Sequence, residues 1–309
     1  MYDNLDTLGD VTLRNLCIPG THDSGTSVCQ DGTFFSPSSD IQTQTLPISA
    51  QLELGIRYFD IRPCLTNGKF YTGHYRNIPV LGWQGANGES IDSIIEALNS
   101  YTKKNAELVI VGFSYAYNTQ NFTVLNQREW GLLFEKLQTV QSAFCIKDAS
   151  PSADFSTDLT SLTLRKFIGG KKSAVLFIVN DNVDLTKYWG RGMYSSQNFN
   201  IFNKYSNIND PETMSGDQLT KMRENSKNSY FLLSWTLTQS YFDAVLSAIF
   251  PCARSSRSIL GLANMANKTL DKKLLPACTS EIRPNIVLVD NVTESLDIVS
   301  LIMKINNLK

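Results

Sequence analysis

Short runs of mostly apolar residues recur along the whole chain and predict β-strands. The run 174–179 is unbroken, and 108–113 contains only apolar side chains and one glycine. Strands that are covered on both faces show this pattern, whereas half-exposed strands alternate between apolar and polar residues. The predicted strands are 13–18, 55–62, 69–74, 108–115, 174–179, 230–237 and 286–290.

Apolar residues between these strands follow a helical period. Each of three stripes has the spacing of a helix with one apolar face, which predicts packing against a core. The stripes consist of Ile91, Ile94, Ile95 and Leu98, of Trp130, Leu133, Phe134, Leu137 and Val140, and of Leu296, Val299, Ile302 and Met303.

The alternation of strands and helices predicts an α/β fold with a parallel sheet. A strand count near eight favours closure of that sheet into a single, irregular TIM-type (β/α) barrel. No linker interrupts the chain, so residues 1–309 are expected to form one domain. The polar segments 31–44 and 180–209 are expected to be long loops at the functional face, and disorder is the alternative for both.

Composition limits the classes of partner. The chain has 28 basic and 29 acidic side chains, so no bulk charge favours nucleic acid or an anionic membrane. With 42% hydrophobic residues it can form a normal core. The longest purely apolar run, 174–179, is too short to span a bilayer, and the first residues lack the pattern of a signal peptide. We expect a monomer without a transmembrane segment, whose contact with a membrane is local.

Cysteines and glycosylation motifs bear on the compartment. The six cysteines show no metal-ligand spacing, and Asn-X-Thr motifs begin at Asn121, Asn267 and Asn291. Together they predict a secreted protein with disulfide bonds. The alternative is a cytosolic protein with six free thiols and glycosylation motifs that occur by chance. The cysteines are Cys17, Cys29, Cys64, Cys145, Cys252 and Cys278.

The chain contains only two histidines, and both lie near glycine in segments that suit proton transfer. His22 lies in IPGTHDS and is followed by Asp23, and His74 lies in YTGHY. Histidine gives and takes a proton near neutrality more readily than other side chains, so the two indicate an acid and base pair. The alternative is a pair of structural histidines.

Between the histidines, the apolar segment 55–63 is interrupted by charges. Residues two apart in a strand point to the same side, so Asp60 and Arg62 are expected on one face. Charged side chains are rarely buried without a partner or a function. The segment therefore predicts either a buried structural ion pair or a further part of the same site.

Three motifs in the first quarter of the chain carry a family resemblance. IPGTHDSGT, LELGIRYFDIRP and FYTGHY occur in this order between Leu13 and Tyr75. Their order and spacing resemble the catalytic X domain of phosphatidylinositol-specific phospholipases C, in its compact bacterial form. The later strand NIVLVD, which ends in Asp290, resembles the closing strand of that family. The resemblance implies a barrel and a phosphodiesterase that forms a cyclic inositol phosphate and releases diacylglycerol.

Active sites of (β/α) barrels form at the carboxyl ends of the strands, where the candidate residues fall. His22 and Asp23 follow the first predicted strand, and His74 ends the third. In a closed barrel the first and last strands are neighbours, so Asp290 can reach the imidazole of His22, fix its tautomer and raise its basicity. By the resemblance, His22 removes the proton of the inositol hydroxyl next to the phosphate. His74, assisted by Asp23, protonates the leaving oxygen.

The resemblance also assigns a role to the charges of the second motif. Arg62 is expected to donate to the phosphate oxygens as their charge grows, with Asp60 holding it in place. Calcium-dependent relatives carry carboxamide and carboxylate ligands where this chain has Asp23, Asp60 and Arg62. A fixed cation repels a metal ion, so we expect no cofactor and no calcium requirement. The alternative is a metal ion held by Asp23 and Asp60.

The residues that grip inositol in compact bacterial relatives are not recognisable here. One middle strand ends in Ser114 and Tyr115 where those relatives have a lysine. A flat aromatic side chain can stack on a sugar, so Tyr115 and Trp235 are candidate substrate-binding residues. The expected substrate is phosphatidylinositol, or a glycosylated form of it, at a membrane surface. Alternatives are another head group with the same chemistry, or a lipid- or inositol-binding module without turnover.

After His74, the segment 78–83 is largely apolar and ends in Trp83. If this segment is exposed at the catalytic rim, it resembles an interfacial anchor, since tryptophan favours the boundary between lipid and water. The alternative is a loop folded onto the barrel.

Overall fold

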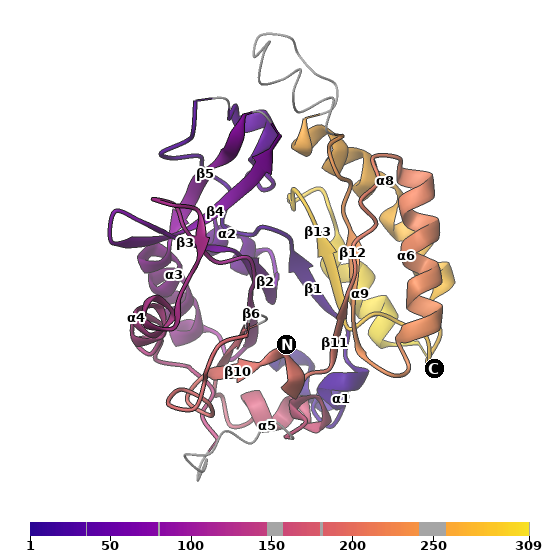
Figure 1. The fold of residues 1–309 in the computed structure, drawn as a ribbon. Coiled ribbons are helices and arrows are strands. Elements are labelled where there is room, and N and C mark those ends of the chain that lie inside the picture. Colours follow the sequence, from indigo (N-terminus) through magenta and orange to yellow (C-terminus); the bar gives the residue numbers. More distant parts are fainter. Residues whose placement is uncertain (35, 80, 147–156, 180–181, 241–257, 309) are drawn as a thin grey trace.

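A computed structural model describes residues 1–309 except 35, 80, 147–156, 180–181, 241–257 and 309 (Figure 1). Its main sheet has eight strands, all paired in parallel, in the order β10-β9-β6-β2-β1-β13-β12-β11. The strands are β1 (Ile18–Thr21), β2 (Tyr58–Ile61), β6 (Leu108–Phe113), β9 (Ala174–Val179), β10 (Met193–Ser195), β11 (Ile201–Asn203), β12 (Tyr230–Trp235) and β13 (Ile286–Val289).

This sheet curls into a barrel with an open seam. The first and last strands are neighbours, with Ile18 of β1 opposite Ile286 of β13. Among the described residues no pairing joins β10 to β11. These two strands are consecutive in the chain and are linked by the 3-10 turn η5 (Ser196–Asn198) instead of a long helix. The predicted irregular barrel is confirmed.

Helices cover the outside of the sheet, which explains the unbroken apolar strands. β6 and β9 are buried along their whole length because one face lies inside the barrel and the other packs on helices (Figure 1). The described helices are α1 (Leu5–Leu8), α2 (Ile48–Glu53), α3 (Ile91–Lys104), α4 (Gln127–Leu137), α5 (Leu164–Ile168), α6 (Pro211–Asn225), α8 (Ile259–Ala277) and α9 (Ile298–Asn306). The three predicted apolar stripes lie on α3, on α4 and the residues just after it, and on and just before α9.

A second, smaller sheet stands beside one rim of the barrel (Figure 1). Its strands, in the order β5-β4-β3-β7-β8, are β3 (Pro63–Thr66), β4 (Lys69–Ile78), β5 (Gly82–Ser90), β7 (Tyr117–Asn118) and β8 (Thr123–Val124). The predicted strand 69–74 is therefore real, but it belongs to an antiparallel hairpin. Placing His74 at the end of a barrel strand was wrong: it lies within β4.

The segment 78–83 forms the turn of this hairpin, and residue 80 lies outside the described residues. The Trp83 ring stacks on Phe122 at 5.1 Å, almost parallel, and lies 5.2 Å from the Tyr117 ring. Ile78 is buried. The segment is thus folded back, onto the small sheet and not onto the barrel itself.

Other boundaries also differ from the sequence prediction. Residues 13–15 form a 3-10 turn and the strand begins only at Ile18, so the predicted strand 13–18 was displaced. The segment 180–209 is not all loop, because it contributes β10 and β11 to the barrel. Apart from residue 35, the segment 31–44 is a loop with one 3-10 turn, as expected.

The described cysteines do not form disulfides, so the expected disulfide bonds are absent from this part of the chain. Cys17, Cys64 and Cys278 are buried thiols, while Cys29 and Cys145 are exposed. Cys252 lies outside the described residues.

The glycosylation motifs differ in accessibility. Asn121 is exposed, but Asn291 is buried and donates to the side chain of Asn264 at 3.0 Å. The side chain of Asn267 donates to the backbone carbonyl of Asp290 at 2.9 Å. Only the first motif therefore has the accessibility that glycosylation needs.

Within the described part of the chain, none of the helices combines the length and apolar character needed to cross a bilayer.

Candidate active site

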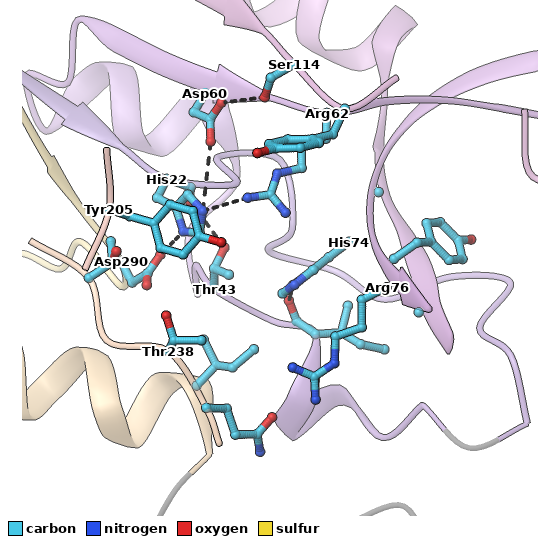
Figure 2. A pocket seen from close by; sticks show the side chains of 18 of the residues that line it. His22, Thr43, Asp60, Arg62, His74, Arg76, Ser114, Tyr205, Thr238 and Asp290 are labelled. Carbon is cyan, nitrogen blue, oxygen red and sulfur yellow. Dashed lines mark hydrogen bonds and ion pairs between the residues drawn. The ribbon is translucent and has the colours of Figure 1, made fainter. Parts of the chain in front are cut away.

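Adjacent central strands place the candidate residues at one edge of the barrel. His22 follows β1 and Asp290 follows β13, and because these strands pair in register, the two residues are brought side by side. The backbone N–H of His22 continues the ladder by donating to the carbonyl of Val289 at 3.0 Å. The predicted approach of Asp290 to the imidazole of His22, through neighbouring first and last strands, is confirmed (Figure 2).

Both ring nitrogens of His22 have partners. Nδ1 lies 2.9 Å from Oδ1 of Asp290, and Nε2 lies 2.9 Å from Nη2 of Arg62. The side chains of Thr43 and Gln44 donate to the backbone carbonyl of His22 at 3.3 and 3.0 Å, which fixes the turn behind the ring. An arginine N–H can donate only to an unprotonated nitrogen, so this geometry belongs to the tautomer with the proton on Nδ1.

Asp23 lies at the centre of the charged groups. Its carboxylate is fully buried and lies 2.6 Å from Nε of Arg62, 3.6 Å from Nε2 of His22 and 3.8 Å from Nδ1 of His74. Its backbone has a φ of 41°, in the left-handed region that non-glycine residues rarely adopt. Although burial alone would raise the pKa of Asp23, Arg62 and both histidines lower it below its usual value.

Asp60 does not hold Arg62 in the way the sequence suggested. Its Oδ1 accepts from Oγ of Ser114 at 3.3 Å, and its Oδ2 lies 4.0 Å from Nε2 of His22. The ion pair of Arg62 is with Asp23, at a point where the left-handed backbone of Asp23 turns the chain. Burial raises the pKa of Asp60 above its usual value.

His74 reaches the site from the hairpin. Its Nδ1 lies 2.9 Å from the backbone carbonyl of Ile41, in the loop 31–44, which assigns the proton to Nδ1 in the neutral ring. Asp23 lies farther away, so the expected help from that carboxylate is a charge effect at 3.8 Å and not a direct hydrogen bond.

The two histidines are shifted in opposite directions. Burial lowers the pKa of His22, but the charges of Asp23 and Asp290 outweigh it and raise that pKa to about 9. Burial is the main reason that the pKa of His74 lies below its usual value; Asp23 opposes the effect and Arg62 adds to it. Groups whose pKa values are driven apart in one pocket are typical of acid and base catalysis.

The two aromatic candidates for substrate binding, Tyr115 and Trp235, differ in exposure. Tyr115 is 55% exposed and lines the pocket, with the guanidinium carbon of Arg62 5.0 Å from its ring centroid. Trp235 is fully buried, and its indole N–H donates to the carbonyl of Ala266 at 2.9 Å. The expectation that Trp235 contacts substrate was wrong, because its side chain points outward into the layer between β12 and α8.

A pocket of about 1030 Å³ is lined by the candidate residues other than Asp23 and Trp235, namely His22, Asp60, Arg62, His74, Tyr115 and Asp290. Sequence reasoning missed several of its walls. Arg76, two residues after His74, lines it from the hairpin, and Tyr205 and Thr238 line it from the opposite side (Figure 2). The alternation of side chains along a strand was the available signal for Arg76, since residues 74 and 76 share one face.

A cluster of His22, Asp23 and Asp60 offers three ligand atoms within 4.8 Å of one another. A metal ion there would meet the guanidinium of Arg62, which already lies 2.6 Å from one carboxylate and 2.9 Å from the imidazole. The geometry therefore favours Arg62, not a metal ion, as the cation that neutralises these groups.

Proteins with PI-PLC X domains are among the known proteins that this chain is similar to. No family model matches the chain. The bovine PI-PLC X domain-containing protein 3 is 23% identical over 97% of this chain and 91% of its own length. A 1-phosphatidylinositol phosphodiesterase of Listeria monocytogenes is 35% identical, over 35% of this chain and 30% of its own. A Dictyostelium discoideum PI-PLC X-box domain-containing protein is 29% identical, over 37% of this chain but only 16% of its own.

Solved structures share the fold over nearly the whole chain. A phosphatidylinositol-specific phospholipase C of Staphylococcus aureus has a TM-score of 0.67 at 16% identity and covers 98% of this chain and 97% of its own. That of Listeria monocytogenes has a TM-score of 0.60 at 18% identity, over 96% and 95%. The fold is the α/β barrel of these bacterial proteins. The sequence matches confirm the resemblance to the PI-PLC X-domain family that the motifs indicate.

Proposed function

We propose that the chain is a metal-independent phosphodiesterase of the phospholipase C type, which cleaves phosphatidylinositol or a glycosylated relative into a cyclic inositol phosphate and diacylglycerol. The observation that carries the proposal is the convergence of His22, Arg62, His74 and Asp290 in one pocket. A relative that bears the name 1-phosphatidylinositol phosphodiesterase, 35% identical over 35% of this chain, supports the same chemistry.

In this mechanism Arg62 moves from the imidazole to the phosphate when substrate binds. Its guanidinium then donates to the phosphate oxygens, where charge grows in the transition state. The move exposes Nε2 of His22, which Arg62 otherwise occupies at 2.9 Å. That nitrogen is then free to take the proton of the neighbouring inositol hydroxyl, while Asp290 stabilises the imidazolium through Nδ1.

The bond changes balance without a co-reactant. The hydroxyl oxygen forms a bond to phosphorus as its proton passes to His22. The bond from phosphorus to the glycerol oxygen breaks, and that oxygen takes a proton from His74. Because Nδ1 of His74 faces a carbonyl, Nε2 is the nitrogen that donates.

A different head group with the same chemistry is the second candidate. The pocket carries the neutral hydroxyls of Ser114, Ser234 and Thr236 near the strand ends. These groups favour an uncharged polyol, which need not be inositol.

We also infer local contact with a membrane and a location outside the cytosol. The exposed side chains of Phe34 and Tyr205 support the first inference, since both lie in segments that border the pocket, and Phe34 is 93% exposed. The exposed glycosylation motif at Asn121 supports the second.

Phosphorus NMR of phosphatidylinositol turnover tests the proposal. A cyclic phosphodiester should appear before any acyclic monophosphate. His22→Ala and His74→Ala should each reduce turnover by at least ~10²- to 10⁴-fold, the usual contribution of one acid or base. Acyclic monophosphate from the earliest times, or phosphatidic acid, would contradict the mechanism. A phospholipid panel in the same assay separates the two head-group candidates.

A further inference from the structure

Arg76 presents a second guanidinium to the catalytic pocket. It lies on β4 opposite Gln84 of β5, two residues beyond His74, so both side chains project from the same face of the strand. Both line the pocket. Figure 2 shows the side chain of Arg76 extending into the open centre, with His74 between it and Arg62.

The carboxylates of this pocket are already engaged elsewhere. Asp60 accepts a hydrogen bond from Ser114, and Asp290 lies at hydrogen-bond distance from Nδ1 of His22. Asp40 accepts from Nε2 of Gln239 at 2.9 Å. Within the part of the chain that the structure describes, none of the ion pairs or side-chain hydrogen bonds involves Arg76. A half-buried guanidinium without a counter-charge, facing a cavity, is a binding position for an anion.

The order of the residues along the pocket wall indicates where this anion binds relative to the scissile phosphate. Arg62 serves the scissile phosphate in the proposed function, and His74 faces the leaving oxygen. Two residues of extended strand separate His74 from Arg76 by about 7 Å between Cα atoms. Arg76 therefore lies beyond the scissile bond, on the side of the leaving group.

We propose that Arg76 binds a second phosphate group, on the leaving-group side of the scissile phosphate. The direction rests on the proposed function, whereas the presence of the subsite rests on the pocket alone. The phosphate has two sources, a phosphate on the leaving half of the same molecule or the phosphate of a neighbouring lipid. Lys204, exposed on another wall of the pocket, adds positive charge to the same space.

Binding of inorganic phosphate, measured by titration calorimetry, tests the subsite without turnover. The wild-type protein should bind two phosphates, and Arg76→Gln should bind one. Arg76→Lys should retain the second, because it keeps the charge. Lys69→Gln is the matched control, since it removes one exposed positive charge from the same strand outside the pocket, and should bind two. Equal stoichiometry in wild type and Arg76→Gln would overturn the proposal.

Rates identify the source of the phosphate. One arm compares a soluble inositol phosphodiester that has a neutral leaving alcohol with the same compound phosphorylated on that alcohol. The other arm compares phosphatidylinositol in vesicles of phosphatidylcholine with vesicles that also contain phosphatidylglycerol. In the arm that represents the true source, the wild-type protein should cleave its substrate about 10- to 100-fold faster when the second phosphate is present. This factor corresponds to the free energy of a hydrogen bond to a charged group.

That preference should collapse in Arg76→Gln and persist in Lys69→Gln. Preference in the soluble arm assigns the phosphate to the substrate, and preference in the vesicle arm alone assigns it to a neighbouring lipid. No preference in either arm overturns the proposal. If wild type cleaves none of these compounds, the proposed function fails, and the phosphate stoichiometry still decides whether the subsite exists.

Discussion

At the scale of single residues, charges of opposite sign act on the ring of His22. Arg62 donates to Nε2 in the free site, while Asp23 and Asp290 favour protonation of the ring. The sequence predicted three of these residues from their place, because His22, Arg62 and Asp290 directly follow strands of the barrel. His74 was found by its residue type, since it lies within β4 and not at a strand end. The sequence did not predict the pairing of Arg62 with Asp23, because the backbone at residue 23 is left-handed and does not follow strand alternation.

The pH dependence of kcat/KM follows from the opposed shifts. The active form has His22 neutral and His74 protonated, and it is a minority of the protein because the pKa of His22 is raised to about 9 while that of His74 is lowered. Its population, and with it the rate, should rise until pH passes the lowered pKa of His74, stay level, and fall as pH passes about 9. Asp290→Asn removes one of the charges that raise the pKa of His22, so the falling limb should move toward neutral pH.

As a control for that shift, Asp271→Asn removes an exposed carboxylate outside the pocket and should leave both limbs in place. Both limbs belong to a coupled pair. A falling limb that stays near pH 9 in Asp290→Asn would show that this carboxylate does not act on His22.

Arg62 should be the cation that turnover requires. Activity should survive an excess of chelator, and Arg62→Lys should lose most of it, because an ammonium cannot reproduce two parallel hydrogen bonds to the phosphate. Loss of wild-type activity in chelator, with recovery on addition of calcium, would instead support a metal ion held by Asp23 and Asp60.

Tyr115 should position Arg62 through its ring. A cation over an aromatic face contributes about 0.5 to 2 kcal/mol, so Tyr115→Ala should lower kcat/KM by up to about 30-fold. Tyr115→Phe keeps the ring and should retain wild-type activity. Equal loss in both variants would assign the effect to the hydroxyl, as expected if Tyr115 contacted the substrate.

At the scale of elements, the sequence predicted strands better than their sheet. The apolar run 174–179 matches β9 in full, because a strand buried on both faces has an unbroken pattern. The apolar pattern of residues 69–74 predicts a strand, but it is the same for a strand of a hairpin and a strand of the barrel. The pattern therefore could not predict which strands residues 69–74 pair with. α6 has few apolar residues among many polar ones, which hid it.

Two glycines in regular elements should respond in opposite ways to alanine. Gly112 on β6 packs against the hydroxyl of Tyr58, and a Cβ there would overlap it. Gly112→Ala should therefore lower the free energy of unfolding by about 1 to 3 kcal/mol, the cost of overpacking. Gly216 in α6 has open space beside it, so Gly216→Ala should raise the free energy of unfolding by roughly 0.5 to 1 kcal/mol. Urea denaturation measures both free energies of unfolding. Changes of the same sign in the two variants would contradict the packing described for Gly112 and Gly216.

At the scale of the whole molecule, the sheet order places the catalytic strands at the centre. β2, β1 and β13 are adjacent in the middle of the order, whereas β10 and β11 are its two edges. The count of predicted strands indicated a barrel. It could not reveal the seam, because the two edge strands have three residues each in a polar segment.

Amide hydrogen exchange should follow this order. Edge strands open at a lower free energy than central ones, so amides of β10 and β11 should exchange well before those of β1 and β13. Mass spectrometry of peptides from these strands measures the difference. Uniform protection across the sheet would mean that the seam is closed in solution.

The open seam borders the pocket without touching the catalytic strands, since Ser196 and Ile201 line the pocket from beside it. Side-chain substitutions at these two partly buried positions leave the backbone hydrogen bonds between strands in place. Such changes can widen or narrow the space for a head group, while the spacing of His22 and Asp290 stays fixed by the pairing of β1 with β13. The barrel thus separates the choice of head group from the chemistry. Directed evolution confined to Ser196 and Ile201, which line the pocket, and sparing the buried Asn198 and Phe199 between them, is the direct route to a new head group.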